Sequence, residues 1–472
     1  MPASDNTPSL QPSILVIFGI TGDLSRRKVL PALHNLCRDG LIPDNTKIIG
    51  ISRREVSHDE IMGIIKDSLA ANPSGIDQAA LDRLAAWTSM FKLDPVSDAD
   101  YESLKAKLNQ IETESGRCMD RLFYLSIPPQ VYAPIIDKLG QHGLNQGCDH
   151  QLGQARIMIE KPFGYDVSTA EKLISDTNRV FREEQIFRID HYLAKETAQN
   201  ILKFRRHNPV FSKQWNSRHI KRIHVIAKES IGIENRVAFY ESVGAMRDLV
   251  QSHLMQLLAL TAMDMPEHLS SDEVHASKHR FLDSLIPPHG DVLKQVVRGQ
   301  YDSYRQEVNN PASNTETFVS LVLKSSDPNW HGTEFQMTTG KSLDEKLTKI
   351  IVYYGEGGDT NALTFRIQPD EGIDVNLLIE EPGYTNALQE VKMNFSYSQY
   401  FDTSGHDAYE RVLVDGMRGD HLLFATKSEV MAAWRLLQPV FDYWHNHSQD
   451  LVIYPNNGPG PSTTHLNLSY NN

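Results

Sequence analysis

A short stretch of the chain, RIDHYLAKE at 188–196, places four polar side chains where an apolar run meets a loop. Asp190, His191, Tyr192 and Lys195 offer a carboxylate, an imidazole, a phenol and an ammonium group. An imidazole can move a proton near neutral pH, and a carboxylate can orient it. Hydroxyl, imidazole and ammonium donors together suit a phosphate group. Residues of these types could take part in proton transfer or hold an anion, and the stretch alone does not decide between the two.

The bulk composition limits what kind of protein can carry this chemistry. At 472 residues, the chain is longer than one hydrophobic core usually serves, so we expect two domains. The apolar content of 40% and the charged content of 23% are ordinary for a globular protein. The formal charge of −13 repels polyphosphate backbones and anionic membrane surfaces, so nucleic acid and membranes are not expected partners.

The cysteines and the N-terminus indicate a cytoplasmic protein. Cys37, Cys118 and Cys148 are odd in number and widely spaced, which argues against a disulfide framework and predicts buried packing residues in a reducing compartment. The first residues lack the pattern of a secretion signal, and the longest apolar stretch, near 255–263, is too short to span a bilayer. No His/Asp/Glu cluster has metal-ligand spacing, so no metal is expected.

The pattern of apolar runs predicts two domains of different class. Between residues 13 and 190, the runs SILVIF, KIIGIS, RLFYLS, ARIMIE and QIFRID alternate with amphipathic segments at 58–71, 100–114, 129–140 and 167–184. Such runs predict a doubly wound parallel sheet. After helical stretches at about 193–206 and 243–262, closely spaced strand patterns from TFVSLVLKS to LQEVKMNFSYS leave no room for crossover helices. They predict an α+β domain with one large, mainly antiparallel sheet, closed by helices near 405–416 and 428–447.

A glycine turn after the first predicted strand has the context of a dinucleotide site. Gly19 and Gly22 lie between SILVIF and a helix, where the backbone can approach a pyrophosphate and the helix amides favour its charge. Only GxxG is present, and two glycines in a strand-to-helix turn can also be purely structural. The second predicted strand ends in Arg53 and Arg54, where an NAD site usually has an acid, so arginine favours NADP. Either arginine could instead be a solvated loop residue.

Four motifs in this order and spacing resemble glucose-6-phosphate dehydrogenases: GITGDLSRRK (19–28), EKPFGYD (160–166), RIDHYLAKE (188–196) and RDLVQSHL (247–254). The likeness extends through GTEFQMTTGKSLDEK to AAWRLLQPVFDYWH and so covers nearly the whole chain. It implies a Rossmann-like NADP-binding domain at 1–190 and an α+β substrate-binding and dimerisation domain at 191–472. The implied reaction oxidises the C1 hydroxyl of β-D-glucose 6-phosphate to the 1,5-lactone, the first step of the oxidative pentose phosphate pathway. The implied assembly is a homodimer or homotetramer.

The resemblance also assigns the catalytic pair. It implies that His253 is the general base and that Asp190 orients it. From the residues alone, an imidazole that shares a helical face with Met246, Val250 and Leu257 is more often a core residue, and Asp190 could be a helix cap.

Further positions are assigned by the same resemblance. The implied substrate ligands are Lys161, His191, Tyr192, Lys195, Glu229, Asp248, Lys341 and, more weakly, Lys346. The implied coenzyme ligands are Gly19, Thr21, Gly22, Asp23, Leu24, Lys28, Arg53, Ser126 and Lys161, with the SIPPQ loop at 126–130 lining the crevice. Two segments depart from the family pattern: Ala238-Phe239 replaces a Gly-Tyr pair, and NNGPGPSTTH replaces a GSWGP-like segment.

Two other functions stay open at this stage. An NADP-dependent oxidoreductase of the broader EKPxG kind, acting on an unphosphorylated sugar, would not need His191, Tyr192, Lys195 and Lys341 to converge. A catalytically silent NADP-binding regulator could lose its base, so the presence of Asp190 and His253 speaks against it.

Overall fold

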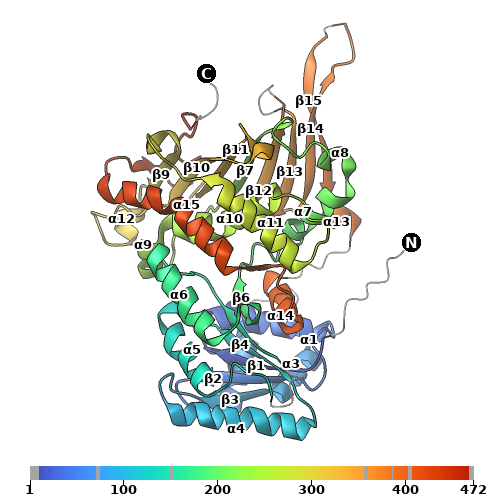
Figure 1. Ribbon diagram of the computed structural model, residues 1–472, viewed down its shortest axis with the longest axis vertical. Helices are drawn as coiled ribbons and strands as arrows, with labels where there is room; N and C mark the ends of the chain where they lie inside the picture. Colours follow the sequence, from blue (N-terminus) through green and yellow to red (C-terminus); the bar gives the residue numbers. More distant parts are fainter. Residues whose placement is uncertain are drawn as a thin grey trace. The chain divides into compact units, whose positions relative to one another are not determined.

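The computed structural model describes residues 10–70, 75–148, 154–355, 360–384, 386–401 and 407–466 (Figure 1). The chain forms two compact units. The first contains Met1–Phe163, Glu171–Ala194 and His406–Thr426, and the second contains Gly164–Ala170, Lys195–Gly405 and Lys427–Asn472. The units therefore do not follow a single cut at residue 190, because a late segment returns to the first unit.

The first unit is built on a parallel sheet, as predicted. Within the described residues it has seven strands in the order β16-β6-β5-β4-β1-β2-β3, parallel except for β16 against β6. The strands are β1 (Ser13–Phe18), β2 (Lys47–Ser52), β3 (Thr88–Lys92), β4 (Asp120–Leu125), β5 (Ala155–Ile159), β6 (Ile186–Ile189) and β16 (Phe424–Ala425). Five of them match the predicted runs. β3 was not predicted, because its sequence TSMFK is only partly buried and lacks the aliphatic signature of a central strand.

Helices connect the strands of this sheet. They are α1 (Leu30–Arg38), α2 (His58–Leu69), α3 (Gln78–Trp87), α4 (Asp98–Ser115), α5 (Tyr132–Gln141) and α6 (Val167–Val180), with α14 (Ala408–Arg418) from the late segment. Ser57, Asp77 and Ser97 accept hydrogen bonds from the first turns of α2, α3 and α4, which fixes where these helices begin.

The structure pairs two of the three cysteines, contrary to the prediction of unpaired thiols. Cys118 and Cys148 form a disulfide with their Cα atoms 5.9 Å apart, while Cys37 is free and buried as predicted. Cys118 precedes β4 and Cys148 precedes β5, and these two strands are parallel neighbours. Their N-terminal ends therefore adjoin, although 30 positions separate the cysteines in the sequence.

The second unit is built on a large, mainly antiparallel sheet. Its described strands follow the order β15-β14-β13-β12-β7-β11-β10-β9-β17, and β8 pairs with β10. They are β7 (Ile220–Lys228), β8 (Leu285–Ile286), β9 (Val296–Tyr301), β10 (Phe318–Ser325), β11 (Glu334–Gly340), β12 (Leu347–Tyr354), β13 (Ala362–Gln368), β14 (Gly372–Glu380), β15 (Leu388–Ser396) and β17 (Val452–Tyr454). Two pairs, β7 with β11 and β9 with β17, are parallel.

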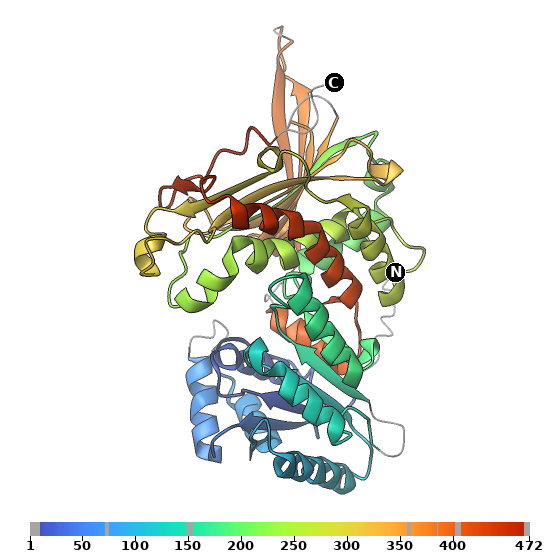
Figure 2. The same ribbon diagram turned by 60° about the vertical axis from the view of Figure 1, so that its left-hand side comes forward.

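Helices lie over this second sheet, some of them directly on its strands and some on other helices (Figure 2). The principal ones are α7 (Glu196–His207), α9 (Val237–Ala245), η4 (Met246–Leu254), α10 (Met255–Ala262), α11 (Ser271–Ser284) and α15 (Lys427–Asn446). The helix predicted at about 243–262 is continuous from Met246 to Ala262, and Gly244, whose φ of 68° and ψ of 175° are not helical, separates it from the preceding turns of α9. In the part of the chain that the structure describes, no helix has both the length and the apolar character needed to cross a bilayer.

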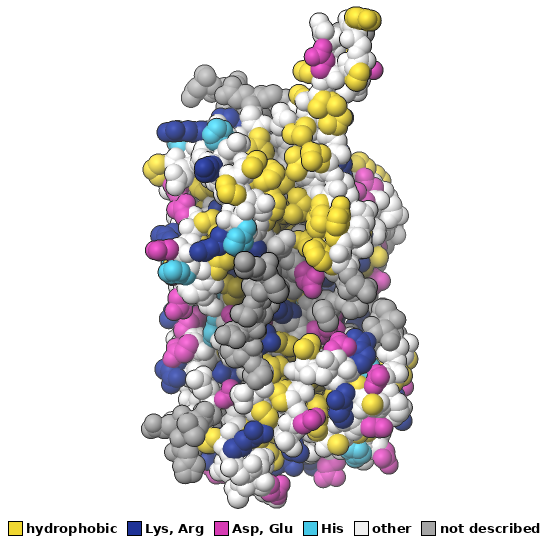
Figure 3. Space-filling view, turned by 90° about the vertical axis from the view of Figure 1, so that its right-hand side faces the viewer, with side chains coloured by type: hydrophobic (Ala, Val, Ile, Leu, Met, Phe, Trp, Pro, Cys, Tyr) yellow, Lys and Arg dark blue, Asp and Glu magenta, His cyan; other side chains and the backbone are white. Residues whose placement is uncertain are grey.

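The β14–β15 hairpin extends beyond the rest of the second sheet and carries exposed apolar side chains. Leu377, Ile379 and Met393 are 39%, 46% and 62% exposed. Figure 3 shows hydrophobic side chains gathered on one face of this unit. A surface of this kind is unusual unless another protein covers it.

Candidate active site

The glycine turn after β1 is tightly fixed in the first unit. Gly19 has φ of 78°, and a Cβ atom there would lie 2.5 Å from the carbonyl oxygen of Ser126. The Gly22 amide donates to the Gly19 carbonyl at 2.8 Å, and the Ser25 hydroxyl bonds to the same carbonyl and to Ser126 Oγ. Glycine at position 19 is therefore required by space as well as by backbone conformation.

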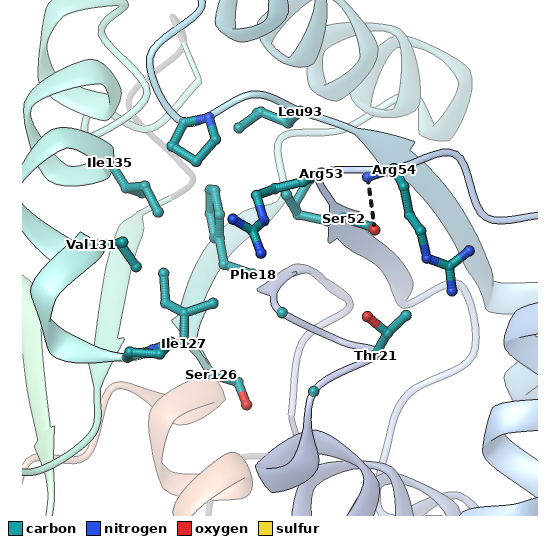
Figure 4. Close-up of a pocket in the computed structure, with 15 residues that line it drawn as sticks. Phe18, Thr21, Ser52, Arg53, Arg54, Leu93, Ser126, Ile127, Val131 and Ile135 are labelled. Carbon is teal, nitrogen blue, oxygen red and sulfur yellow. Dashed lines mark hydrogen bonds between the residues drawn. The ribbon is translucent and has the colours of Figure 1, made fainter. Parts of the chain in front are cut away.

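A cavity of about 650 Å³ opens over this turn (Figure 4). Gly19, Thr21, Gly22, Arg53 and Ser126 line it, which brings together five of the predicted coenzyme residues. The two arginines differ: Arg54 forms an ion pair with Glu60, and in Figure 4 its guanidinium points away from Arg53. Arg53 is thus the better placed cation.

Apolar side chains complete the wall of this cavity. Ile127 and Pro128 belong to the predicted SIPPQ loop. The others come from β2, from the loop after β3 and from the region that begins α5, and they were not predicted: Ile51, Leu93, Pro95, Val131 and Ile135. Size, apolar walls, a glycine turn and a cation are the features of a nucleotide site, so the residues present fit a nicotinamide dinucleotide.

Four predicted coenzyme residues are not among those that line the cavity: Asp23, Leu24, Lys28 and Lys161. Asp23 forms an exposed ion pair with Arg27 at 2.8 Å, and Lys28 pairs with Asp407 at 2.9 Å. Leu24 is helical and directly precedes the π-helical turn Ser25–Val29. Their roles remain predictions.

The RIDHYLAKE stretch begins at the end of β6. Asp190 is 2% exposed, and its Oδ1 accepts a hydrogen bond from the Tyr192 amide at 3.0 Å. Helix α7 begins only at Glu196, so the Asp190 carboxylate closes a local turn and does not cap that helix. The His191 ring lies 5.1 Å from the Tyr192 ring and 6.1 Å from the Tyr409 ring.

The EKPFG motif follows β5 in the same unit. The Lys161–Pro162 peptide bond is cis, and Lys161 is partly exposed. The preceding residue, Glu160, is 8% exposed and accepts a hydrogen bond from the Tyr124 hydroxyl at 2.6 Å. Burial raises the pKa of the Glu160 carboxyl to about 7 from an ordinary value of 4.5, although Tyr124 and the charge of Lys161 favour the ionised form.

Replacing Glu160 with glutamine should flatten the pH dependence of stability. Because the folded protein holds this proton more tightly than the unfolded chain, the free energy of unfolding falls as pH rises from about 4.5 to about 7. The shift corresponds to a fall of roughly 3 kcal/mol in the free energy of unfolding over this pH range. The Glu160→Gln variant should not show this fall. Scanning calorimetry at pH 5 and pH 8 measures the difference, with the exposed Glu114→Gln as control. Equal pH dependence in wild type and Glu160→Gln would contradict the assignment.

The helix that carries His253 has a defined start in the second unit. The Glu316 carboxylate accepts a hydrogen bond from the Met246 amide at 3.0 Å, and its backbone carbonyl accepts one from the Ala245 amide at 2.9 Å. A Cβ atom at Gly244 would lie 2.4 Å from Glu316 Oε1. Because Gly244 has no side chain, the Glu316 carboxylate can reach the N-terminal end of the helix. This role of Glu316 was not predicted from the sequence.

The same helix is wound as a π-helix from Met246 to Leu254. In an α-helix, residues five apart are rotated by roughly 140°, which would separate Asp248 from His253. In a π-helix, hydrogen bonds join residues five apart, so these two lie toward one face. Their side chains are 7% and 1% exposed. The winding thus places two predicted site residues on the same face of the helix, and π turns are frequent at functional sites.

Glu229 and Lys341 meet at the ends of two parallel strands. Glu229 follows β7, and Lys341 follows β11, with Lys228 opposite Gly340 in the register. The Lys341 ammonium forms an ion pair with the Glu229 carboxylate and lies 5.3 Å from the centre of the Tyr240 ring. Lys195 is partly exposed at the start of α7, and Lys346 is exposed in the turn before β12.

Comparisons with known proteins agree with this architecture. The family described as "Glucose-6-phosphate dehydrogenase, NAD binding domain" matches residues 16–200, and "Glucose-6-phosphate dehydrogenase, C-terminal domain" matches residues 202–471. Glucose-6-phosphate 1-dehydrogenase of Chlamydia muridarum is 37% identical over 95% of this chain and 93% of its own. The Rhizobium meliloti protein of the same name is 35% identical over 96% and 95%.

A solved structure extends the likeness to three dimensions. A glucose-6-phosphate dehydrogenase in complex with its substrate glucose 6-phosphate superposes with a TM-score of 0.88, at 31% identity and over 96% of each chain. Both family domains match, and the likeness covers 93–96% of the length of these relatives. The chain belongs to the glucose-6-phosphate dehydrogenase family.

Proposed function

We propose that the chain oxidises the C1 hydroxyl of β-D-glucose 6-phosphate to 6-phospho-D-glucono-1,5-lactone with NADP+. Family membership gives the dehydrogenase activity on glucose 6-phosphate with a nicotinamide coenzyme. The observation that carries the choice of NADP+ is Arg53, which lines the cavity over the glycine turn where an NAD site usually has an acid.

In this proposal, the bound nicotinamide supplies the hydride acceptor, and the protein moves the proton. His253 takes the proton from the C1 hydroxyl as hydride leaves, because a neutral imidazole is a competent base near neutral pH. Asp190 orients that imidazole and stabilises its protonated form. The burial of both side chains supports these roles, since buried charges interact strongly.

The remaining predicted residues bind the substrate. His191, Tyr192 and Lys195 hold the phosphate together with Lys341, while Lys346 is the weaker candidate because it is exposed in a turn. Glu229 and Asp248 accept hydrogen bonds from sugar hydroxyls. Lys161 follows a parallel strand, where ligands collect, and serves both substrate and coenzyme.

We also propose that the enzyme acts in the cytoplasm as a homodimer or homotetramer, with residues 1–190 binding the coenzyme and 191–472 binding the substrate and the partner subunit. The exposed apolar side chains of the β14–β15 hairpin support association. A single species of 53.4 kDa in sedimentation would contradict it.

A direct assay tests the proposed reaction. Purified protein is offered glucose 6-phosphate or glucose, with NADP+ or NAD+, and reduced nicotinamide is followed by absorbance. We expect the phosphorylated sugar with NADP+ to give the highest kcat/KM. Equal rates with glucose would favour the broader sugar oxidoreductase, and no turnover would favour a silent coenzyme-binding protein.

Replacing Arg53 with alanine should weaken NADP+ selectively. Loss of a charge-assisted contact to the 2′-phosphate costs about 1.5–3 kcal/mol, so the KM for NADP+ should rise roughly tenfold to a hundredfold. The KM for NAD+ should change little. Arg54→Ala is the matched control, because Arg54 is held by Glu60. An equal loss for both coenzymes would show that Arg53 does not read the 2′-phosphate.

A further inference from the structure

Lys341 is a buried cation whose ion-pair partner is more exposed than itself. Its side chain is 2% exposed, whereas that of Glu229 is 28% exposed. The ammonium group therefore lies behind the carboxylate relative to solvent. An anion arriving from solution meets Glu229 before it can bind Lys341.

Backbone and ring contacts fix this pair in place. The Glu229 amide donates to the Gly340 carbonyl at 2.9 Å, and the Leu343 amide donates to the Glu229 carbonyl at 3.0 Å. The Tyr454 hydroxyl donates to the Lys341 carbonyl at 2.7 Å, and the Tyr240 ring supports the ammonium. Because these bonds fix both backbones, the ion pair can open only by rotation of the two side chains.

The Glu229 carboxylate and the substrate's phosphate compete for the Lys341 ammonium group. A phosphate near-dianion carries more charge than a carboxylate and competes for the same ammonium donors. Once the phosphate holds Lys341, two anions lie side by side, and their repulsion drives the flexible carboxylate away. Glu229 is then available to hydroxyl groups of the sugar ring.

We propose that the Lys341–Glu229 ion pair is a latch that the substrate's phosphate opens. The phosphate takes Lys341, and the released Glu229 accepts hydrogen bonds from the sugar. When an unphosphorylated sugar binds, Glu229 is still paired with Lys341 and does not bind the sugar hydroxyls. The latch therefore discriminates against unphosphorylated sugars. This inference rests on the proposed function, and it adds a coupling between phosphate binding and sugar binding.

The latch can be tested by phosphate binding alone. Inorganic phosphate is titrated into the full chain by calorimetry, without sugar or coenzyme. Glu229→Gln removes the competing charge and should lower the Kd for phosphate roughly tenfold, the scale of a partly buried ion pair. Glu229→Asp should give a smaller change of the same sign. Glu345→Gln, which loses a nearby exposed partner of Lys228, should leave the Kd unchanged.

A double substitution and a turnover measurement complete the test. Lys341→Met in the Glu229→Gln background should abolish the gain in phosphate affinity. In the wild-type enzyme, inorganic phosphate above its Kd should raise kcat/KM for glucose several-fold, and Lys341→Met should remove that activation. Unchanged or weaker phosphate binding in Glu229→Gln overturns the latch, as does glucose oxidation that phosphate does not stimulate. The phosphate titration tests the latch without turnover, whereas the absorbance assay tests the dehydrogenase reaction. Failure of one proposal can therefore be distinguished from failure of the other.

Discussion

Replacing His253 with asparagine is expected to lower kcat by roughly 10²- to 10⁴-fold, the contribution of a positioned general base. His253 is 1% exposed and lies on the π-helical segment that also carries Asp248. Asparagine keeps a similar size and polarity but cannot accept the proton. The acidic limb of the pH profile of kcat/KM should disappear with it.

The affinity for NADP+ and the unfolding temperature separate a chemical effect from a structural one. Both should stay close to wild type in His253→Asn. His219→Asn serves as the matched control, because His219 is an exposed histidine of the same unit. Turnover within a factor of a few of wild type would show that His253 is a packing residue and that the base lies elsewhere.

Replacing Lys278 with methionine should destabilise the protein by about 3–5 kcal/mol, the cost of leaving a buried charge without its partner. Lys278 Nζ lies 2.9 Å from Glu429 Oε2, and both side chains are 0% exposed. Gln256 and His275 complete the cluster at 2.9 and 2.8 Å. The charge of Lys278 and the contacts of His275 outweigh burial and lower the pKa of Glu429 to about 2.

The direction of this pKa shift determines the pH range in which the cluster stabilises the folded protein. Because the folded pKa lies below the ordinary value of 4.5, the stability that Glu429 contributes is present above that pH and is lost as pH falls toward about 2. The loss in Lys278→Met should therefore be fully visible at pH 7 in calorimetric unfolding.

Two further variants make the Lys278 experiment decisive. Lys294→Met breaks an exposed pair with Asp291 and should cost less than about 1 kcal/mol. The double variant Lys278→Met, Glu429→Leu should regain most of the stability, since apolar replacements of buried pairs are often neutral. A single variant as stable as the Lys294 control would show that the cluster contributes little.

Much of the fold was predictable because its strands are aliphatic runs with sharp ends. SILVIF and KIIGIS became β1 and β2 with the boundaries expected. Strand β3 was not predicted, because TSMFK has no clear strand pattern and forms a strand by pairing with β2. The Cys118–Cys148 disulfide was not predicted for a similar reason, since the two cysteines come together only because β4 and β5 are neighbours in the sheet.

The candidate site was predictable in its residue types and less so in its geometry. Gly19, Thr21, Gly22 and Arg53 do surround one cavity. The ion pair of Glu229 with Lys341 depends on a parallel pairing between strands more than a hundred positions apart, which no local pattern encodes. The role of Glu316 likewise arises from a tertiary contact, and the helical pattern of the sequence did not reveal the π winding at Met246–Leu254. Pairing of Asp190 with His253 stays a prediction.

The return of residues 406–426 to the first unit has a consequence for synthesis on the ribosome. Strand β6 is flanked by β5 on one side and by β16, at Phe424–Ala425, on the other. Until that late segment emerges, the nascent coenzyme-binding unit has an open strand edge of the kind that invites intermolecular pairing. A fragment ending at residue 190 would keep that edge permanently, so it should require a chaperone or aggregate when expressed alone.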